Sequence, residues 1–376
     1  MFAAAAPGAA VFFSRKGRMS SHSSFSRRQF GGMLAAAVGA AGAPALAAAA
    51  QPKGARMQAH PLIKPARLRQ DDLVAIIAPA GFTDEDAIAK AVGNLESLGL
   101  RVTLGANIRA VHGNYAGTVQ QRLDDLHAAF RDPQVKAVWA IRGGSGCISL
   151  LALIDYKLIR ANPKILIGYS DITALHLAIH RHTGLVTFHG PVASSTFSEY
   201  TVTHLKNVLM QPQEQYTIPM ALENHRRAQT HANFTIRTVQ GGQATGRLTG
   251  GNLCMVSALA GTPYAAEFHE RILFLEEINE APYRVDRMLY QLDLASNLST
   301  AAALMLGVFM HCEADEGDIA LSLDQTLDQH LQPLAVPAVA GYSFGHIRDQ
   351  FTLPMGILAT LDAERQTVTL LEAAVS

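Results

Sequence analysis

The sequence predicts an α/β protein of two domains. A parallel, Rossmann-like sheet flanked by helices is expected in the N-terminal domain, and a mixed sheet in a smaller C-terminal α/β domain. Between residues 71 and 207, short apolar strands alternate with helices, which is typical of a doubly wound parallel sheet. Between residues 241 and 376, short strands are separated by more turns, which indicates a mixed sheet. The polar stretch 208–240 is expected to link the two domains.

The elements of the N-terminal domain follow from apolar runs, helical spacing and turn residues. The expected strands are 73–78, 101–104, 135–141 and 165–167, and the expected helices are 83–98, 118–130 and a segment after 146 that runs through Leu150, Leu151 and Ile154. The first strand ends in Pro79-Ala80-Gly81, and the third in Arg142-Gly143-Gly144-Ser145-Gly146. Ligands bind at the carboxyl ends of strands in such sheets. The loop 142–146 and the residues after 167 are therefore expected to share a site.

The C-terminal domain has fewer helical segments. The stretch Tyr283–Leu294 is expected to be a helix, because Leu289 and Leu292 lie on one face of it. The expected strands are 271–276, 303–309, 337–340 and 366–371. With 49% hydrophobic residues, the chain has enough apolar material for a sizeable core.

The first 50 residues resemble an export signal. Arg27 and Arg28 precede an Ala/Gly-rich apolar run with almost no charge. A basic region, an apolar region and small residues near a cleavage site make up a secretory signal, and the arginine pair is typical of the twin-arginine route. The sequence therefore predicts a periplasmic protein with a signal at 1–50 and a linker at 51–70. The alternatives are a transmembrane anchor or a disordered tail, and Pro44 argues against a stable membrane span.

Composition narrows the classes of partner. The formal net charge is zero and no basic stripe stands out, so nucleic acid is not an expected partner. Three widely spaced cysteines, Cys147, Cys254 and Cys312, leave at least one free thiol. Proteins exported by the twin-arginine route fold before export, so these cysteines are expected to behave as small apolar residues.

A serine lies between a buried strand and a helix in the stretch 165–176. The apolar residues 165–167 form the strand, Gly168 permits a sharp turn, and a helix is expected to begin directly after Ser170, at Asp171. Nucleophile elbows are built at such turns, and the first free amides of the helix can face an oxyanion. Ser170 is therefore a candidate nucleophile. The alternative is that it only caps the helix.

A serine nucleophile needs a base and usually an acid that orients the base. Among 15 histidines, His346 follows an apolar strand and a glycine, as a loop residue on a rigid scaffold would. Glu276 ends an apolar strand, where a carboxylate is costly unless it is paired. The order Ser170, Glu276, His346 is the Ser–acid–His order of the α/β-hydrolases, although the serine lacks their G-x-S-x-G elbow. The alternatives are an ordinary polar loop residue for His346, and for Glu276 a surface turn or an ion pair with Arg284 or Arg287.

Two backbone amides are candidates for an oxyanion hole. Asp171 follows the serine directly, and Gly144 lies after a neighbouring strand, where glycine lets the backbone approach closely. A glycine-rich loop can also hold a phosphate. The stretch Arg-Gly-Gly-Ser-Gly fits neither the P-loop nor G-x-G-x-x-G well.

Together these stretches resemble the LD-carboxypeptidases, serine peptidases that act on muramoyl tetrapeptides, and their siblings, the microcin C immunity peptidases. The resemblance spans nearly all of residues 70–360, with its stretches in the family's order. The stretches are Ala78-Pro79-Ala80-Gly81, Arg142-Gly143-Gly144-Ser145-Gly146, Gly168-Tyr169-Ser170-Asp171-Ile172-Thr173-Ala174-Leu175, Gly250-Gly251-Asn252-Leu253, Leu275-Glu276-Glu277-Ile278-Asn279-Glu280, Tyr283-Arg284-Val285-Asp286-Arg287-Met288-Leu289 and Phe344-Gly345-His346.

The resemblance implies a catalytic triad and a reaction. Ser170 would be the nucleophile, Glu276 the acid and His346 the general base, with oxyanion amides on Gly144 and Asp171. The reaction would release the terminal D-alanine from the L-centre of diaminopimelate in a murein tetrapeptide. The family uses no metal or other cofactor, and its usual assembly is a homodimer with the site between an N-terminal and a smaller C-terminal domain.

Substrate contacts are less sharply defined. Arg287 or Arg284 could hold the carboxylate of the substrate, or both could form structural ion pairs. Ser145 stands where the family often has tyrosine, which would alter the wall of the pocket. An exported member would meet periplasmic muropeptides or the wall itself, whereas well-known members act on recycled fragments in the cytoplasm.

Two other functions remain as alternatives. A microcin-type peptidase that acts on acylated nucleotides would need an aromatic side chain to stack on the base. The only tryptophan, Trp139, lies in an expected strand and is predicted to be in the core. A periplasmic binding protein without catalysis is the third hypothesis, and the Ser–acid–His order argues against it.

Overall fold

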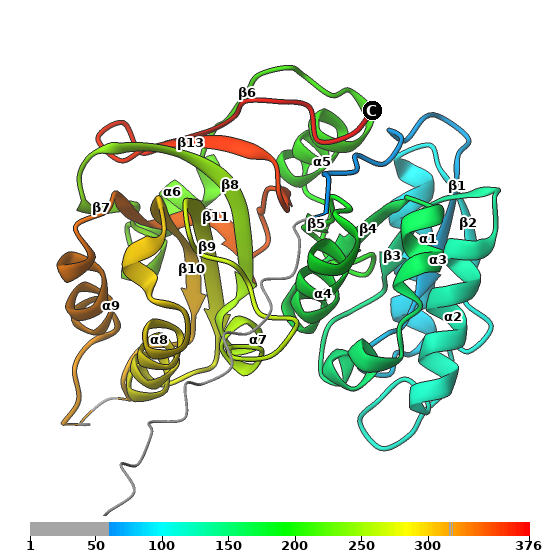
Figure 1. Cartoon of the computed structure of the whole chain (residues 1–376), viewed down its shortest axis with the longest axis horizontal. Coiled ribbons are helices and arrows are strands. Elements are labelled where there is room, and N and C mark those ends of the chain that lie inside the picture. Colours follow the sequence, from blue (N-terminus) through cyan, green and yellow to red (C-terminus); the bar gives the residue numbers. More distant parts are fainter. Residues whose placement is uncertain (1–59, 316, 318) are drawn as a thin grey trace, which may run out of the picture. The chain divides into compact units, whose positions relative to one another are not determined.

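The computed structural model describes residues 60–315, 317 and 319–376, and residues 58–376 form one unit. The predicted signal at 1–50 and residues 51–59 of the predicted linker lie outside the described residues. The described chain forms two sheets with helices around them (Figure 1), one of six strands and one of eight. The predicted α/β class, with a parallel first sheet and a mixed second sheet, is confirmed.

The first sheet has the strand order β12-β5-β4-β3-β1-β2. Its strands are β1 (Leu73–Ile77), β2 (Arg101–Leu104), β3 (Val135–Ala140), β4 (Ile165–Gly168), β5 (Phe188–His189) and β12 (Leu353–Pro354). All neighbouring pairs are parallel except β12 with β5, which is antiparallel. Strand β2 lies on one side of β1, and the later strands β3, β4 and β5 lie on the other side. The loops after β1 and β3 therefore flank the switch point of the sheet, where ligands bind in such folds.

Helices follow the strands of the first sheet in alternation. They are α1 (Glu85–Ser97), α2 (Val119–Arg131), α3 (Tyr156–Ala161), α4 (Thr173–Thr183) and α5 (Glu199–Leu205), with the 3-10 turns η1 (Cys147–Leu153) and η2 (Ser170–Ile172) and the π-helical turn η3 (Lys206–Met210). Asp84 caps α1, and Thr118 forms a capping box with Gln121 at the start of α2. The segment after Gly146, expected to be helical, is the 3-10 helix η1.

The second sheet has the strand order β6-β14-β13-β8-β9-β10-β11-β7. Its strands are β6 (Tyr216–Ile218), β7 (Arg237–Gln240), β8 (Gln243–Asn252), β9 (Arg271–Ile278), β10 (Ala303–Met310), β11 (Ala338–Gly345), β13 (Leu358–Asp362) and β14 (Thr367–Leu370). The four central strands β8 to β11 are parallel, and the outer pairings are antiparallel. The carboxyl ends of β8, β9 and β11 therefore lie at the same edge of the sheet.

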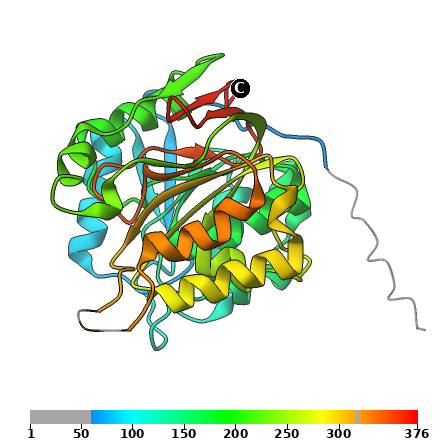
Figure 2. The ribbon, with the colours of Figure 1, turned by 90° about the vertical axis from the view of Figure 1, so that its left-hand side faces the viewer.

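Two long helices lie side by side against the second sheet, as Figure 2 shows in yellow and orange. They are α8 (Pro282–Ser296) and α9 (Leu323–Leu331), joined by a hydrogen bond of 2.8 Å between His330 Nε2 and Asp286 Oδ1. The remaining helical segments are α6 (Leu222–Arg227), α7 (Leu253–Ala258) and the 3-10 turns η4 (Ala232–Phe234), η5 (Leu298–Thr300) and η6 (Gln332–Leu334). Among the described helices, none combines the length and the hydropathy that a membrane span requires.

Residues 208–240, expected to be a polar linker, contain β6, α6 and β7. Strand β6 pairs with β14 and β7 pairs with β11, so this stretch contributes both edge strands of the second sheet. Edge strands face solvent on one side and tolerate polar residues. Their composition therefore resembles that of a loop, and apolar periodicity does not reveal them.

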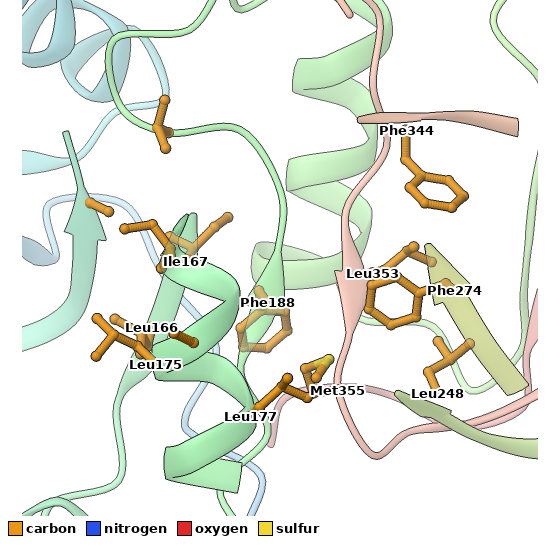
Figure 3. Close-up of a cluster of buried hydrophobic side chains, with 14 of the residues drawn as sticks. Leu166, Ile167, Leu175, Leu177, Phe188, Leu248, Phe274, Phe344, Leu353 and Met355 are labelled. Atoms are coloured by element: carbon orange, nitrogen blue, oxygen red, sulfur yellow. The ribbon is translucent and has the colours of Figure 1, made fainter. Parts of the chain in front are cut away.

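One continuous apolar core joins the two sheets. Figure 3 shows Leu166, Ile167 and Leu175 on one side, Phe274, Phe344 and Leu248 on the other, and Phe188, Leu177, Leu353 and Met355 between them. The labelled side chains come from strands of both sheets, from α4 and, for Met355, from the turn after β12. Trp139 is fully buried in β3, as predicted, and its indole N–H donates to the carbonyl of Pro191 at 2.8 Å.

Truncation of Phe188 tests how much this shared core contributes to stability. We expect Phe188→Ala to lower the free energy of unfolding by about 3–5 kcal/mol, because a fully buried aromatic side chain is lost and a cavity remains. Leu222→Ala is the control: that side chain is 76% exposed in α6, and we expect a change within about 0.5 kcal/mol. Urea unfolding followed by circular dichroism measures both, and equal effects would contradict the shared core.

Candidate active site

Ser170 occupies a strained turn at the carboxyl end of β4. Its φ is 64°, a left-handed conformation that residues other than glycine rarely adopt. The 3-10 turn η2 begins at this serine, and α4 follows with Ile172, not Ser170, at its N-cap position. Ser170 thus does not cap α4, which removes the alternative reading of this serine. Strain of this kind concentrates at functional sites.

The glycine-rich loop after β3 packs directly against the serine. A Cβ atom on Gly143 would lie 2.8 Å from Ser170 Cβ and 3.0 Å from its Oγ, so only glycine fits at this position. The amide of Gly81, after β1, donates to the carbonyl of Gly143 at 3.2 Å. The loops at the switch point of the first sheet therefore form one wall beside Ser170.

Glu276 and His346 form a buried pair. His346 Nδ1 donates to Glu276 Oε2 at 2.7 Å, and the side chains are 15% and 0% exposed. Gly345 has a φ of 114°, and a Cβ atom there would lie 3.0 Å from Glu276 Oε2. A glycine before the histidine is therefore required for the close approach. Because Nδ1 donates to the carboxylate, Nε2 is left as the basic nitrogen.

The pKa values of this pair shift in opposite directions. Burial raises the pKa of the Glu276 carboxyl, but the neighbouring His346 and His189 imidazoles bring it below its ordinary value. Burial lowers the pKa of His346, but the charge and the hydrogen bond of Glu276 raise it above its ordinary value of 6.5. Each partner therefore favours the charged form of the other.

The pair lies next to the residue that precedes the serine. The imidazole of His346 packs edge-on against the ring of Tyr169, with centroids 4.8 Å apart. Between the two sheets, the amide of Asn252 at the end of β8 donates to Thr173 Oγ1 in α4 at 3.0 Å. Gly251 allows this contact, because a Cβ atom there would lie 2.5 Å from the side chain of Thr173. The structure thus brings the segments of Ser170, Glu276 and His346 together at the edges of both sheets.

The two predicted oxyanion amides belong to the turn of Ser170 and to the loop that packs against it. Among the described residues, the backbone amides of Gly144 and Asp171 donate no hydrogen bond to another protein group. Gly144 has a φ of 119° and packs against Gly81. The buried carboxylate of Asp171 accepts from the amide of Cys147 at 2.8 Å, which fixes η2 against η1. Their role as oxyanion donors stays a prediction.

Arg284 and Arg287 lie on α8 over the ring of Tyr283, at 5.7 and 5.6 Å from its centroid. Arg284 is 56% exposed and forms an ion pair of 3.5 Å with Glu280. Neither arginine pairs with Glu276 in the described part of the chain. The alternative of a Glu276 ion pair with either arginine is thus excluded, and their role in holding substrate stays a prediction.

Several residues at the site were not identified from the sequence. Glu277 accepts from Asn252 Nδ2 at 2.9 Å and from the Cys254 amide at 2.7 Å. Burial raises the pKa of Glu277 to about 7. His189 is fully buried beside Tyr169 and Phe274. The Gly-Gly-Asn stretch was a signal for Asn252, whereas no local pattern distinguishes His189.

The described residues show no arrangement of three or more His, Cys, Asp or Glu side chains that could hold a metal ion. All three cysteines are free, and Cys147 and Cys312 are buried. Burial raises the pKa of the Cys147 thiol. Cys147 and Cys312 are thus buried side chains of the interior, as predicted for small apolar residues, whereas Cys254 is partly exposed.

Comparison with known proteins identifies the family. Residues 74–190 match the N-terminal domain of LD-carboxypeptidases (peptidase S66), and residues 245–361 match the C-terminal domain. The chain is 37% identical over 318 residues to a probable murein peptide carboxypeptidase of Bacillus subtilis, covering 83% of this chain and 95% of that protein. The chain belongs to the LD-carboxypeptidase family, and the resemblance found in the sequence is confirmed.

Solved structures agree with this assignment. The crystal structure of a muramoyltetrapeptide carboxypeptidase from Oxalobacter formigenes matches with a TM-score of 0.68 at 31% identity, covering 79% of this chain and 97% of that chain. An MccF-like protein from Bacillus anthracis matches with a TM-score of 0.70 at 30% identity, covering 82% and 99%. The chain is therefore a hydrolase of the peptidase class, and its relatives include both a muramoyltetrapeptide carboxypeptidase and an MccF-like protein.

A titration tests the electrostatics of the Glu276–His346 pair. We expect His346 to titrate above 6.5, and Glu276→Gln to move its pKa downward, because the negative charge is lost while the burial remains. Proton NMR of the imidazole measures this shift. Asp286→Asn, which removes the carboxylate partner of His330, should leave His346 unchanged. An unaltered His346 titration in Glu276→Gln would contradict the pairing.

Proposed function

We propose that this protein is a serine LD-carboxypeptidase that removes the terminal D-alanine from murein tetrapeptides through an acyl-enzyme. The observation that carries the proposal is the strained Ser170 at the end of β4, with the buried Glu276–His346 pair packed against its neighbour Tyr169. The Ser–acid–His chain order and the hydrogen bond between Glu276 and His346 support acyl transfer as the reaction. Relatives named as murein peptide and muramoyltetrapeptide carboxypeptidases support the substrate class.

In the proposed mechanism, His346 Nε2 takes the proton from Ser170 Oγ as Oγ bonds to the scissile carbonyl carbon. The carbonyl oxygen becomes an oxyanion, which accepts hydrogen bonds from the amides of Gly144 and Asp171. When the carbon–nitrogen bond breaks, His346 gives the proton to the amine of the leaving D-alanine. Water then attacks the acyl-enzyme with His346 as base, which releases the shortened peptide and restores Ser170.

Glu276 holds the imidazole in the tautomer that leaves Nε2 free and stabilises the imidazolium formed during each proton transfer. The raised pKa of His346 is consistent with this role. Full burial of Glu276 excludes water from the carboxylate, so its charge acts on His346 with little screening.

The microcin-type alternative is supported by the similarity to an MccF-like protein. That function would need an exposed aromatic side chain to stack on a nucleotide base. Trp139 cannot supply it, because its side chain is fully buried in β3 and its N–H is bonded to Pro191. The relatives named as murein peptide and muramoyltetrapeptide carboxypeptidases favour the murein peptide as the substrate.

Mass spectrometry of purified muropeptides tests the proposal. We expect the mature protein to remove one alanine from tetrapeptides and none from pentapeptides, and Ser170→Ala to lower the rate by at least about 10³-fold with the fold intact. Ser97→Ala, at the exposed end of α1, is the control and should retain full activity. Cleavage of an acyl-sulfamoyl nucleotide with no turnover of tetrapeptide would favour the microcin-type function, and turnover of neither would leave the proposal without support.

We infer from the N-terminal sequence that the protein is exported and acts in the periplasm. Arg27 and Arg28 ahead of an apolar Ala/Gly-rich run support the twin-arginine route. We expect the double variant Arg27→Lys and Arg28→Lys to accumulate unprocessed in the cytoplasm, while the native chain appears in the periplasmic fraction. Immunoblots of cell fractions measure this, and periplasmic recovery of the double variant would argue against the route.

A further inference from the structure

A buried arginine lies behind the loops at the switch point of the first sheet. Arg122 projects from the first turn of α2 and is 3% exposed. Its Nη1 donates to the carbonyl of Pro79 at 3.0 Å, after β1, and to the carbonyl of Gly146 at 2.9 Å, after β3. Its Nη2 donates to Ser149 Oγ at 3.2 Å. One guanidinium thus connects two loops that are far apart in the sequence.

The surroundings of Arg122 are shaped for a guanidinium. Its central carbon lies 5.2 Å from the centroid of the Tyr115 ring. Gly146 has a φ of 121°, and a Cβ atom there would lie 2.6 Å from Arg122 Nη1 and 2.8 Å from the Tyr115 ring. Ser149 Oγ in turn donates to the carbonyl of Gly146 at 2.7 Å. The glycine, the ring and the hydroxyl therefore leave room for the planar fork of arginine.

The charge of Arg122 has no direct counter-ion. In the described part of the chain, no carboxylate lies within ion-pair distance of its guanidinium. A buried charge without a partner is costly, and a protein that only needed to tie two loops could use neutral donors. The loop that Arg122 holds at the carbonyl of Gly146 also contains Gly144, whose amide is a candidate oxyanion donor.

We propose that Arg122 is a positioning residue for the oxyanion hole. By holding the carbonyls of Pro79 and Gly146, it fixes the loop 143–146 so that the Gly144 amide faces the carbonyl oxygen attacked by Ser170. Arg122 touches no reacting atom and acts through the loop. The inference deepens the proposed function and rests on it.

Kinetics of two variants test the inference. Loss of an oxyanion donor lowers kcat by about 10²–10³-fold. We expect Arg122→Met to lower kcat for the tetrapeptide by about 10²-fold and Arg122→Lys by about tenfold, because lysine keeps the charge but not the fork. KM should stay within about threefold of its native value, since ground-state binding is little affected. Arg131→Met, at the exposed end of the same helix, should behave as the native enzyme.

The pattern of results separates positioning from general stability. Circular dichroism first shows that each variant is folded, and hydrogen exchange should be faster at 142–149 in the Arg122 variants only. A folded Arg122→Met enzyme with kcat within about threefold of the native value, or with only KM changed, would overturn the inference. If Arg122→Met does not fold, a folded Arg122→Lys enzyme with native kcat, or with only KM changed, would overturn the inference.

A second readout keeps this test separate from the proposed substrate. The rate at which a fluorophosphonate labels Ser170 also depends on the oxyanion hole, because the phosphonyl oxygen takes the place of the oxyanion. If the native protein is labelled but cleaves no tetrapeptide, the proposed substrate is wrong, and the labelling rate still tests the role of Arg122. Equal labelling rates in native and Arg122→Met proteins would then reject it.

Discussion

The carboxylate of Glu276 is fully buried, and the site is organised around the need to compensate its charge. A carboxylate without a partner would be expelled from such an interior or would take up a proton. The Nδ1 N–H of His346 meets this requirement at 2.7 Å. His346 follows β11, which is separated from the strand of Glu276 by β10. The close approach of the two side chains depends on Gly345, which adopts a conformation that other residues rarely adopt. The pairing thus fixes how the imidazole is oriented.

The turn that carries Ser170 and the helix that follows it are also closely packed against neighbouring loops and strands. Gly143 leaves space for Ser170, and Gly251 leaves space for Thr173 in the helix that follows the serine. At each position a single methyl group would overlap with a neighbouring atom, so backbone and side chain are in close contact. Because interiors this densely packed do not deform gradually, the relative placement of Ser170, Glu276 and His346 is set by rigid elements and not by the loops alone.

Much of this arrangement could be predicted from the sequence, for physical reasons that differ between elements. Buried strands such as β4 and β9 contain continuous apolar runs. Ser170 follows β4 and Glu276 comes directly after the apolar part of β9, so strand assignment also located these two residues. The edge strands β6 and β7 are polar and were expected to be a linker. The burial of Arg122 could not be predicted, because an arginine on an amphipathic helix normally faces water. Only the tertiary structure shows that two loops cover its side chain.

Strand β12 links the C-terminal part of the sequence to the first sheet. These two residues, Leu353 and Pro354, come from the C-terminal part of the sequence, yet they cover the free side of β5 in the first sheet. A fragment that stopped before them would leave the backbone groups of β5 unprotected, an open template for pairing with other chains. The C-terminal part therefore acts as an intramolecular guard against self-association of the N-terminal sheet, and the two sequence halves are not interchangeable modules that can be separated and recombined.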